Sequence, residues 1–441
     1  MKYHRVLISF FTLLLPSIVL ASEGGNHQVD FPIWSGSFFV ALLLAIAIFP
    51  LVNSEWWGKK YGYVSLGLAI PAAILVFLKD WHLLLNSVID YISFIILLGS
   101  LFVISGGIVI RISARGTPKL NCILLFIGSI FASLIGTTGA SMVLIRPIIR
   151  ANRWRNNISH IFIFFIFMVS NIGGILTPLG DPPLFLGFLR GVPFFWTLRL
   201  IPFWLFAVAI LLPIFFFIDS YFLKQEDVKS EEWFLKSLDE SSQKRVEIEG
   251  KINFLFLFMV IGSFFIPTIF REIVMLIAAG LSIYFTPFTM REENTFTYHP
   301  IIEVAILFAG IFITMVPMLT MLEVNGSKLG ITEPWQFFWA AGGLSSFLDN
   351  APTYLVFIST ALGVAHTKGI MIIGVPVTYL KAISVGSVFM GANSYIGNGP
   401  NLMVKAICEE NNITMPSFFG YMAWSVGILV PLFIIITFVF F

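Results

Sequence analysis

The sequence predicts an all-α polytopic membrane protein made of two inverted repeats, each with five transmembrane helices, a re-entrant hairpin and a discontinuous helix. Three observations predict this fold. Of the 441 residues, 58% are hydrophobic and only 11% are charged, against roughly 25% charged residues in a soluble domain. Two long apolar segments are interrupted by polar, helix-breaking residues at 177–183 and 396–401. The order of segments is the same in both halves of the chain.

The N-terminal residues 1–21 are predicted to be a signal peptide. A basic start is followed by the apolar run 6–20 and by Val19-Leu20-Ala21, which has the small residue expected at a cleavage site. A retained first helix is the alternative. In either case we expect residues 22–32 to lie outside the cytoplasm.

The first repeat is predicted to span residues 34–218. Irregular backbone is tolerated at membrane depth only where protein buries it or where it lines a cavity. The break at 135–141 therefore indicates a hairpin, and the break at 177–183 indicates a discontinuous helix. The apolar segments of this half are 34–52, 61–79, 91–112, 120–150, 158–190 and 196–218.

Residues 219–251 are polar and are predicted to form a cytoplasmic linker, with a regulatory or partner-binding segment as the alternative. The second repeat, 252–441, has breaks at 345–352 and 397–401. Its apolar segments are 252–270, 273–288, 301–319, 334–361, 376–407 and 417–440. If each hairpin returns to its own side, each half crosses an odd number of times, which makes the repeats inverted.

The distribution of basic residues supports this topology. Most Lys and Arg residues fall in segments that are cytoplasmic when the N-terminus is outside, as the positive-inside rule requires. We therefore expect a multi-pass protein of the cell inner membrane with both termini in the periplasm. Cys122 and Cys408 lie in or beside apolar segments, which indicates free thiols packed as small hydrophobes rather than a disulfide or a metal site.

The four breaks contain the candidate functional residues. One hairpin tip and one helix break from each half would meet near the membrane midplane, where Ser, Thr, Asn and Asp oxygens can hold an alkali cation. The predicted cation- and proton-binding residues are Asp181, Asp349, Asn350, Thr137, Thr138, Ser346, Thr177, Gly180, Asn398, Asn401, Asn171 and Asn393. For Asn171 a place in a helix-packing seam is an equal alternative.

Asp181 and Asp349 determine the expected substrate class. A carboxylate at membrane depth is costly unless it is paired, so it is functional by default. Capping of a half-helix is the structural alternative for each. No Lys or Arg occurs in the four motifs, so such a site would attract a cation and repel a carboxylate. Glu303 is a possible proton relay, although it could simply reach the cytoplasmic interface, and the interface is the expected place of His160.

Four runs of residues together resemble the NhaD-type sodium/proton antiporters of the ion transporter superfamily, which also contains citrate and dicarboxylate carriers and arsenite permeases. The runs are 170–174, 176–188, 347–353 and 391–401, and the resemblance extends from residue 34 onward. It implies an inverted-repeat fold, often dimeric, with an elevator-like motion. The carboxylate carriers have neutral Ser-Asn-Thr hairpin motifs, from which Gly136-Thr137-Thr138-Gly139 and Asp349 depart.

The sequence therefore predicts a secondary transporter, and specifically a Na⁺/H⁺ antiporter that exports sodium in exchange for protons. A buried carboxylate that is either protonated or cation-bound, with access switched in each state, yields such exchange. The main alternative is a Na⁺- or H⁺-coupled transporter of citrate or a related carboxylate; the third is a non-transporting scaffold. We expect no enzymatic activity and no cofactor. The expected partners are membrane lipid, Na⁺, H⁺ and a second copy of the chain, and not nucleic acid.

Overall fold

The computed structural model describes residues 29–112, 114–226, 246–294, 296–364 and 370–441. The predicted signal peptide lies outside these residues. Within them, nine helices are long and apolar enough to cross a membrane. The fold is therefore that of an all-α polytopic membrane protein, as predicted.

One group of helices, here called the frame, is formed by the first three helices of each half. These helices contact one another along their length. They are α2 (Ser37–Val52), α3 (Ser54–Lys79), α4 (Trp81–Ser105), α11 (Ile252–Ser263), α12 (Thr268–Phe285), the short α13 (Phe288–Glu293) and α14 (His299–Asn325).

The remaining helices form a second group, here called the hairpin domain. Its helical hairpins are α5 (Pro118–Ile135) with α6 (Thr137–Asn152), and α15 (Pro334–Ser345) with α16 (Asn350–Val364). Its discontinuous helices are α7 (Ser159–Met168), η3 (Ile172–Leu176) and α8 (Pro182–Leu189), then α17 (Val377–Met390), η6 (Gly391–Asn393) and α18 (Gly399–Glu410). The closing helices are η4 with α9 (Phe194–Leu200, Ile201–Leu223) and α19 (Phe418–Phe440).

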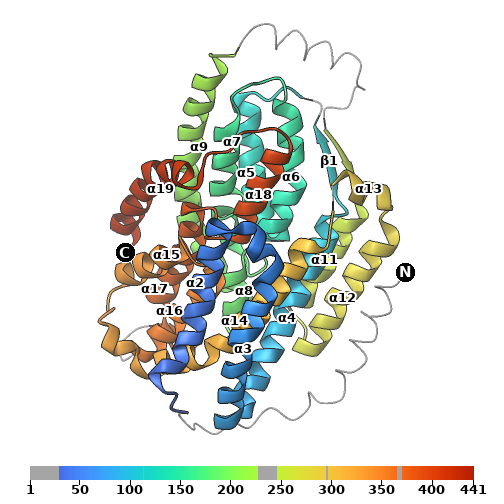
Figure 1. Cartoon of the computed structure of the whole chain (residues 1–441). Helices are drawn as coiled ribbons and strands as arrows, with labels where there is room; N and C mark the ends of the chain where they lie inside the picture. Colours follow the sequence, from blue (N-terminus) through green and yellow to red (C-terminus); the bar gives the residue numbers. More distant parts are fainter. Residues whose placement is uncertain (1–28, 113, 227–245, 295, 365–369) are drawn as a thin grey trace.

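The two groups lie side by side. Figure 1 shows α11 and α12 along one side of the molecule and α15, α17 and α19 along the other. The strand β1 (Val109–Ile112), which follows α4, and its partner β2 (Val246–Glu249), which precedes α11, are counted with the frame. The frame and the hairpin domain contact each other mainly where α14 packs against α16, and where α4 and β1 contact α6.

Specific glycine and proline residues explain why the chain turns at the first hairpin tip and at the first helix break. The first hairpin turns at a single residue, Gly136, whose φ of 82° favours glycine. At the first helix break, a Cβ added to Gly180 would lie 2.1 Å from the carbonyl oxygen of Gly174. A proline begins α8 at Pro182, where the missing N–H costs nothing.

The predicted span at 91–112 differs from the structure at both ends. The helix α4 begins at Trp81 and ends at Ser105, and strand β1 (Val109–Ile112) follows it. This strand pairs antiparallel with β2 (Val246–Glu249), with Val109 opposite Glu249. The β-branched residues of 109–112 suit a strand, but their hydrophobicity alone is equally compatible with a helix end. A second small ribbon joins β3 (Met371–Ile372) to β4 (Val375–Pro376).

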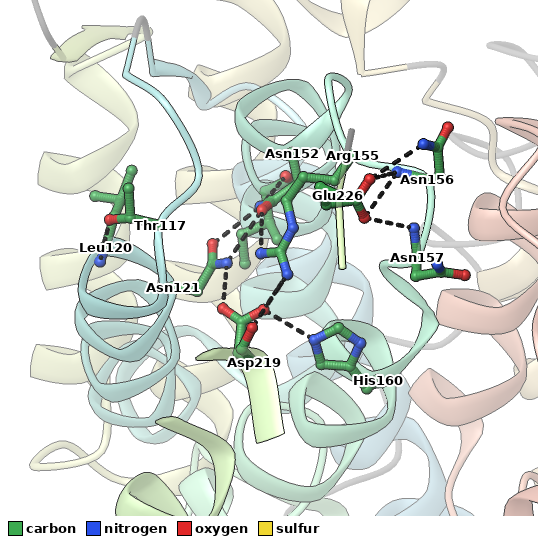
Figure 2. Close-up of polar contacts among 11 residues, drawn as sticks. Thr117, Leu120, Asn121, Asn152, Arg155, Asn156, Asn157, His160, Asp219 and Glu226 are labelled. Carbon is green, nitrogen blue, oxygen red and sulfur yellow. Dashed lines mark hydrogen bonds and ion pairs between the residues drawn. The ribbon is translucent and has the colours of Figure 1, made fainter. Parts of the chain in front are cut away.

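A buried polar cluster closes the base of the first hairpin (Figure 2). Asn121 of α5 and Asn152 of α6 exchange side-chain hydrogen bonds of 3.0 and 2.9 Å, and Asn121 also donates to Asp219 of α9. Asp219 pairs with Arg155 at 2.6 Å and with His160 at 2.9 Å. The sequence placed Asp219 in a solvated linker, which is wrong because Asp219 is buried in α9. His160, which was expected at the membrane interface, is buried within the protein, and the two side chains connect α5, α7 and α9.

We expect Asp219→Ala to lower the stability of the protein strongly. The substitution leaves the buried Arg155 guanidinium without its carboxylate, and breaking a buried ion pair costs about 3–5 kcal/mol. Thermal unfolding of the purified protein in detergent measures the effect. Glu226→Ala is the matched control, because Glu226 accepts hydrogen bonds from Asn156 and Asn157 in an exposed position. Equal melting temperatures for the two variants would contradict this role of Asp219.

Candidate functional site

Asp181 is the centre of the candidate site. It occupies the N-cap position of α8 and is buried. Its carboxylate accepts hydrogen bonds from Thr137 Oγ1 at 2.9 Å, Asn398 Nδ2 at 3.0 Å and Asn350 Nδ2 at 2.5 Å. Three donors around both oxygens are the arrangement that an ionised carboxylate accepts. The donors come from both hairpin tips and from the second helix break, so the two halves of the chain meet at this side chain.

The local structure repeats between the halves. In the first half Thr177 Oγ1 donates to the carbonyl of Ser133 and accepts from the N–H of Leu179. In the second, Ser394 Oγ donates to the carbonyl of Ser346 and accepts from the N–H of Ile396. This correspondence agrees with the predicted internal repeat.

The same correspondence extends to the centre of the site. When Ser133–Ser141 is aligned with Ser346–Tyr354 and Gly180–Pro183 with Gly397–Pro400, Thr137 corresponds to Asn350. Both donate to Asp181. Asp181 corresponds to Asn398, which also donates to it. The site is therefore nearly symmetric in shape and asymmetric in charge.

Three asparagines connect the helix breaks. Asn171 Nδ2 donates to Asn401 Oδ1 at 2.8 Å, and Asn398 Nδ2 lies 3.2 Å from Asn171 Oδ1. Asn401 in turn donates to the carbonyl of Gly391. Asn171 therefore contacts Asn398, which itself donates to Asp181. This contact favours a place beside the candidate site over a place in a helix-packing seam.

Some of the predicted site residues form hydrogen bonds with backbone groups at the helix breaks. The Thr177 hydroxyl and the Gly180 carbonyl are engaged in hydrogen bonds with the first hairpin. Ser346 Oγ donates to backbone carbonyls and accepts from Asn393 Nδ2 at 2.9 Å. These groups stabilise the breaks, and their part in cation binding stays a prediction.

Two buried amide oxygens fit a bound cation. Among the described residues, Asn350 Oδ1 and Asn393 Oδ1 are buried without a hydrogen-bond partner. A buried acceptor without a donor is costly, and an alkali ion would satisfy it with the hard oxygen ligand that such ions prefer. These residues therefore suit a small cation, together with Asp181 or Asp349.

Asp349 lies at the edge of the site. Its Oδ1 accepts from the N–H of Ala351 at 3.0 Å and so caps the start of α16. It is only half-buried, and it lines a cavity. The helix-cap interpretation of Asp349 describes this contact, and its role in cation binding stays a prediction.

The cavity has a volume of about 590 Å³ and lies between the hairpin domain and the frame. On the hairpin domain Asp349, Asn398 and α6 line it; on the frame the start of α14 and parts of α2 and α3 line it. The charged or titratable lining residues are Arg146, His299, Glu303, Asp349 and Glu410. Glu303 therefore faces the same cavity as Asp349.

Arg146 is the residue that the motif analysis missed. Thr138, Met142 and Arg146 recur every fourth position on α6, so one helix face brings the hairpin tip and the guanidinium to the cavity. No arginine lies within the four motifs, as the sequence shows, but the cavity extends beyond them to Arg146. The i, i+4 spacing from Thr138 was the available signal.

Four helix N-termini converge on the site: those of α6, α8, α16 and α18. The N-terminus of a helix has a partial positive charge and exposed N–H groups. Neither α6 nor α18 has a side-chain cap, and Thr138, the second residue of α6, and Gly399, the first residue of α18, line the cavity. Such ends are suited to an anion.

The paired hairpins, the broken helices and the convergent polar site define a membrane transporter. A family profile described as putative citrate transport, CitMHS_2, matches residues 28–441. The chain belongs to this family, which is part of the ion transporter superfamily. The match fits the carboxylate alternative better than Na⁺/H⁺ antiport, and the narrower NhaD-type assignment stays a prediction. Among curated proteins, none matches the chain at a significant level.

Proposed function

We propose that the protein is a cation-coupled transporter of citrate or a related carboxylate. The observation that supports this substrate class is the cavity itself. Arg146 lines the same space as Thr138 and Gly399, which lie at the uncapped N-termini of α6 and α18. The N-termini of two helices and an arginine side chain are the features that recognise an anion with several carboxylates.

The aspartate side chains of the site would bind the coupling cation in this proposal, and not the substrate. Asp181 would hold Na⁺ or a proton, with Asn350, which donates to it from the second hairpin tip, and Asn393 of the second helix break as further amide ligands. The bound cation offsets the negative charge that would otherwise repel the substrate. Cation and carboxylate would thus bind favourably only together, which is the thermodynamic basis of coupling.

The arrangement of the two bodies supports a simple form of alternating access. The side chains that surround Asp181 all belong to the hairpin domain, whereas the frame provides the other wall of the cavity. Movement of the hairpin domain against the frame would expose the intact site first on one face and then on the other. We further propose that the inner membrane contains this protein with both termini in the periplasm.

Na⁺/H⁺ antiport is the second candidate, and the balance of charge in the cavity favours it. Asp349, Glu303 and Glu410 line the cavity against one arginine, Arg146, and His299. This excess of acidic groups attracts cations and could bind and release protons without any carboxylate substrate.

Purified protein in liposomes distinguishes the two candidates. We expect an inward Na⁺ gradient to drive uptake of radiolabelled citrate, or of another di- or tricarboxylate in a competition panel. A pH-sensitive dye inside the same liposomes should not respond to NaCl alone. A dye response to NaCl or LiCl without any carboxylate, together with no uptake of carboxylates, would replace the proposal with antiport.

A further inference from the structure

Arg150 joins the hairpin domain to the frame. It lies in the last turn of α6, and its Nη1 donates to Glu293 Oε1 of α13 at 3.1 Å. Its Nη2 donates to the carbonyl of Ile110 in β1 at 2.8 Å. Both acceptors belong to the frame, so one guanidinium bridges the two bodies.

The acceptor Glu293 is itself fixed within the frame. Arg111 of β1 donates to both oxygens of Glu293, at 3.0 and 2.6 Å, and also binds Glu249 of the paired strand β2. Hydrogen bonds from Arg111, and then from Arg150, hold the pKa of Glu293 below its usual value. The carboxylate therefore stays charged at neutral pH, and the interaction would weaken only as the pH falls through that lowered pKa.

The contact lies at the end of the molecule where the cavity begins. Asn294 and Thr297, which follow directly after α13, line the cavity. Figure 1 shows β1 and α13 in the same part of the molecule as α6. The bridge therefore joins the two bodies beside residues that line the cavity.

We propose that the Arg150–Glu293 contact is a latch that holds the hairpin domain against the frame in this cavity-open conformation. The inference rests on the proposed movement of the hairpin domain. A shift of α6 along the frame must break both bonds of Arg150, whereas the bonds of Arg111 lie within the frame and persist. The latch would thus set how much of the population has the cavity open at this end.

Cross-linking tests the latch directly. In a chain with Cys122→Ala and Cys408→Ala, the pair Arg150→Cys and Glu293→Cys should react with a short bifunctional thiol reagent and lose transport. The control pair is Ile112→Cys with Val246→Cys, because these positions are opposite each other in the β1–β2 ribbon of the frame and leave Arg111 in place. The control should react equally and keep transport. Full transport by the cross-linked 150–293 protein would overturn the latch.

A second measurement needs no substrate, so it separates the latch from the proposed function. Arg150→Gln should lower the labelling rate of Thr138→Cys by an impermeant thiol reagent, about two- to fivefold, because a partly exposed ion pair contributes little more. Lys405→Gln is the control, since Lys405 pairs with Glu409 inside α18. An unchanged labelling rate in Arg150→Gln would refute the latch, whereas absent carboxylate uptake with altered labelling would refute only the proposed substrate.

Discussion

Asp181→Asn is expected to abolish cation-dependent transport, by at least about a hundredfold, while the protein still folds. Asparagine has the size of aspartate but loses the negative charge that would hold the cation in a buried site. The amide also turns an acceptor oxygen into a donor, which then faces donors on Thr137, Asn350 and Asn398. Uptake in liposomes measures the loss, and thermal unfolding in detergent verifies the fold.

The internal symmetry offers a stringent control. In the double variant Asp181→Asn with Asn398→Asp, the carboxylate moves to the corresponding position, the N-cap of α18. In the unmodified protein Asn398 Nδ2 lies 3.0 Å from Asp181 Oδ1. We expect part of the transport to return, because the charge remains among the same amide groups. If Asp181→Asn alone retained normal coupling, the cation site would have to be elsewhere, and Asp349 and Glu303 would be the next residues to replace.

Arg146→Gln is expected to raise the KM for the carboxylate at least about thirtyfold. Removal of one partner from a hydrogen-bonded charge pair costs about 2–5 kcal/mol at a binding interface, and Arg146 is the single arginine lining the described cavity. Arg146→Lys should keep part of the affinity, because an ammonium supplies the charge without the planar fork. Radiolabelled uptake over a range of substrate concentrations measures both variants.

The same substitution distinguishes the candidate functions. If the protein is a Na⁺/H⁺ antiporter, Arg146→Gln removes a positive charge from a cation pathway and should leave exchange intact or increase it. Lys405→Gln, which removes a charge on α18 from a pair within that helix, should behave like the unmodified protein in both assays. An Arg146→Gln variant with an unchanged KM for carboxylate would exclude this residue from substrate binding.

The sequence predicted the hairpins and broken helices well because Pro and Gly in long apolar segments leave few alternatives. Residues 135–141 and 177–183 had to interrupt helices, and the structure has breaks there. The strand at 109–112 could not be predicted, because a short β-branched run is ambiguous and its partner strand lies far away in the chain. Its pairing is a tertiary interaction that no local pattern specifies.

The sequence predicted which polar residues meet at the site, but it did not predict that Arg146 lines the cavity beside them. Asp181 and Asn398 are 217 residues apart, and only the alignment of the two halves indicated that they meet. Arg146 was missed because the search was limited to the four motifs, whereas the cavity follows a helix face for two further turns. Likewise, Asp219 was read as solvated from the polar segment after it, although helix packing buries it.

The central claim is that Asp181 holds the coupling cation, and binding of ²²Na⁺ to the purified protein tests it most directly. The measurement does not depend on the transported substrate or on movement of the hairpin domain. We predict saturable sodium binding by the unmodified protein, tighter binding when citrate is present, and no saturable binding by folded Asp181→Asn. Sodium binding of unchanged affinity in Asp181→Asn would contradict the claim.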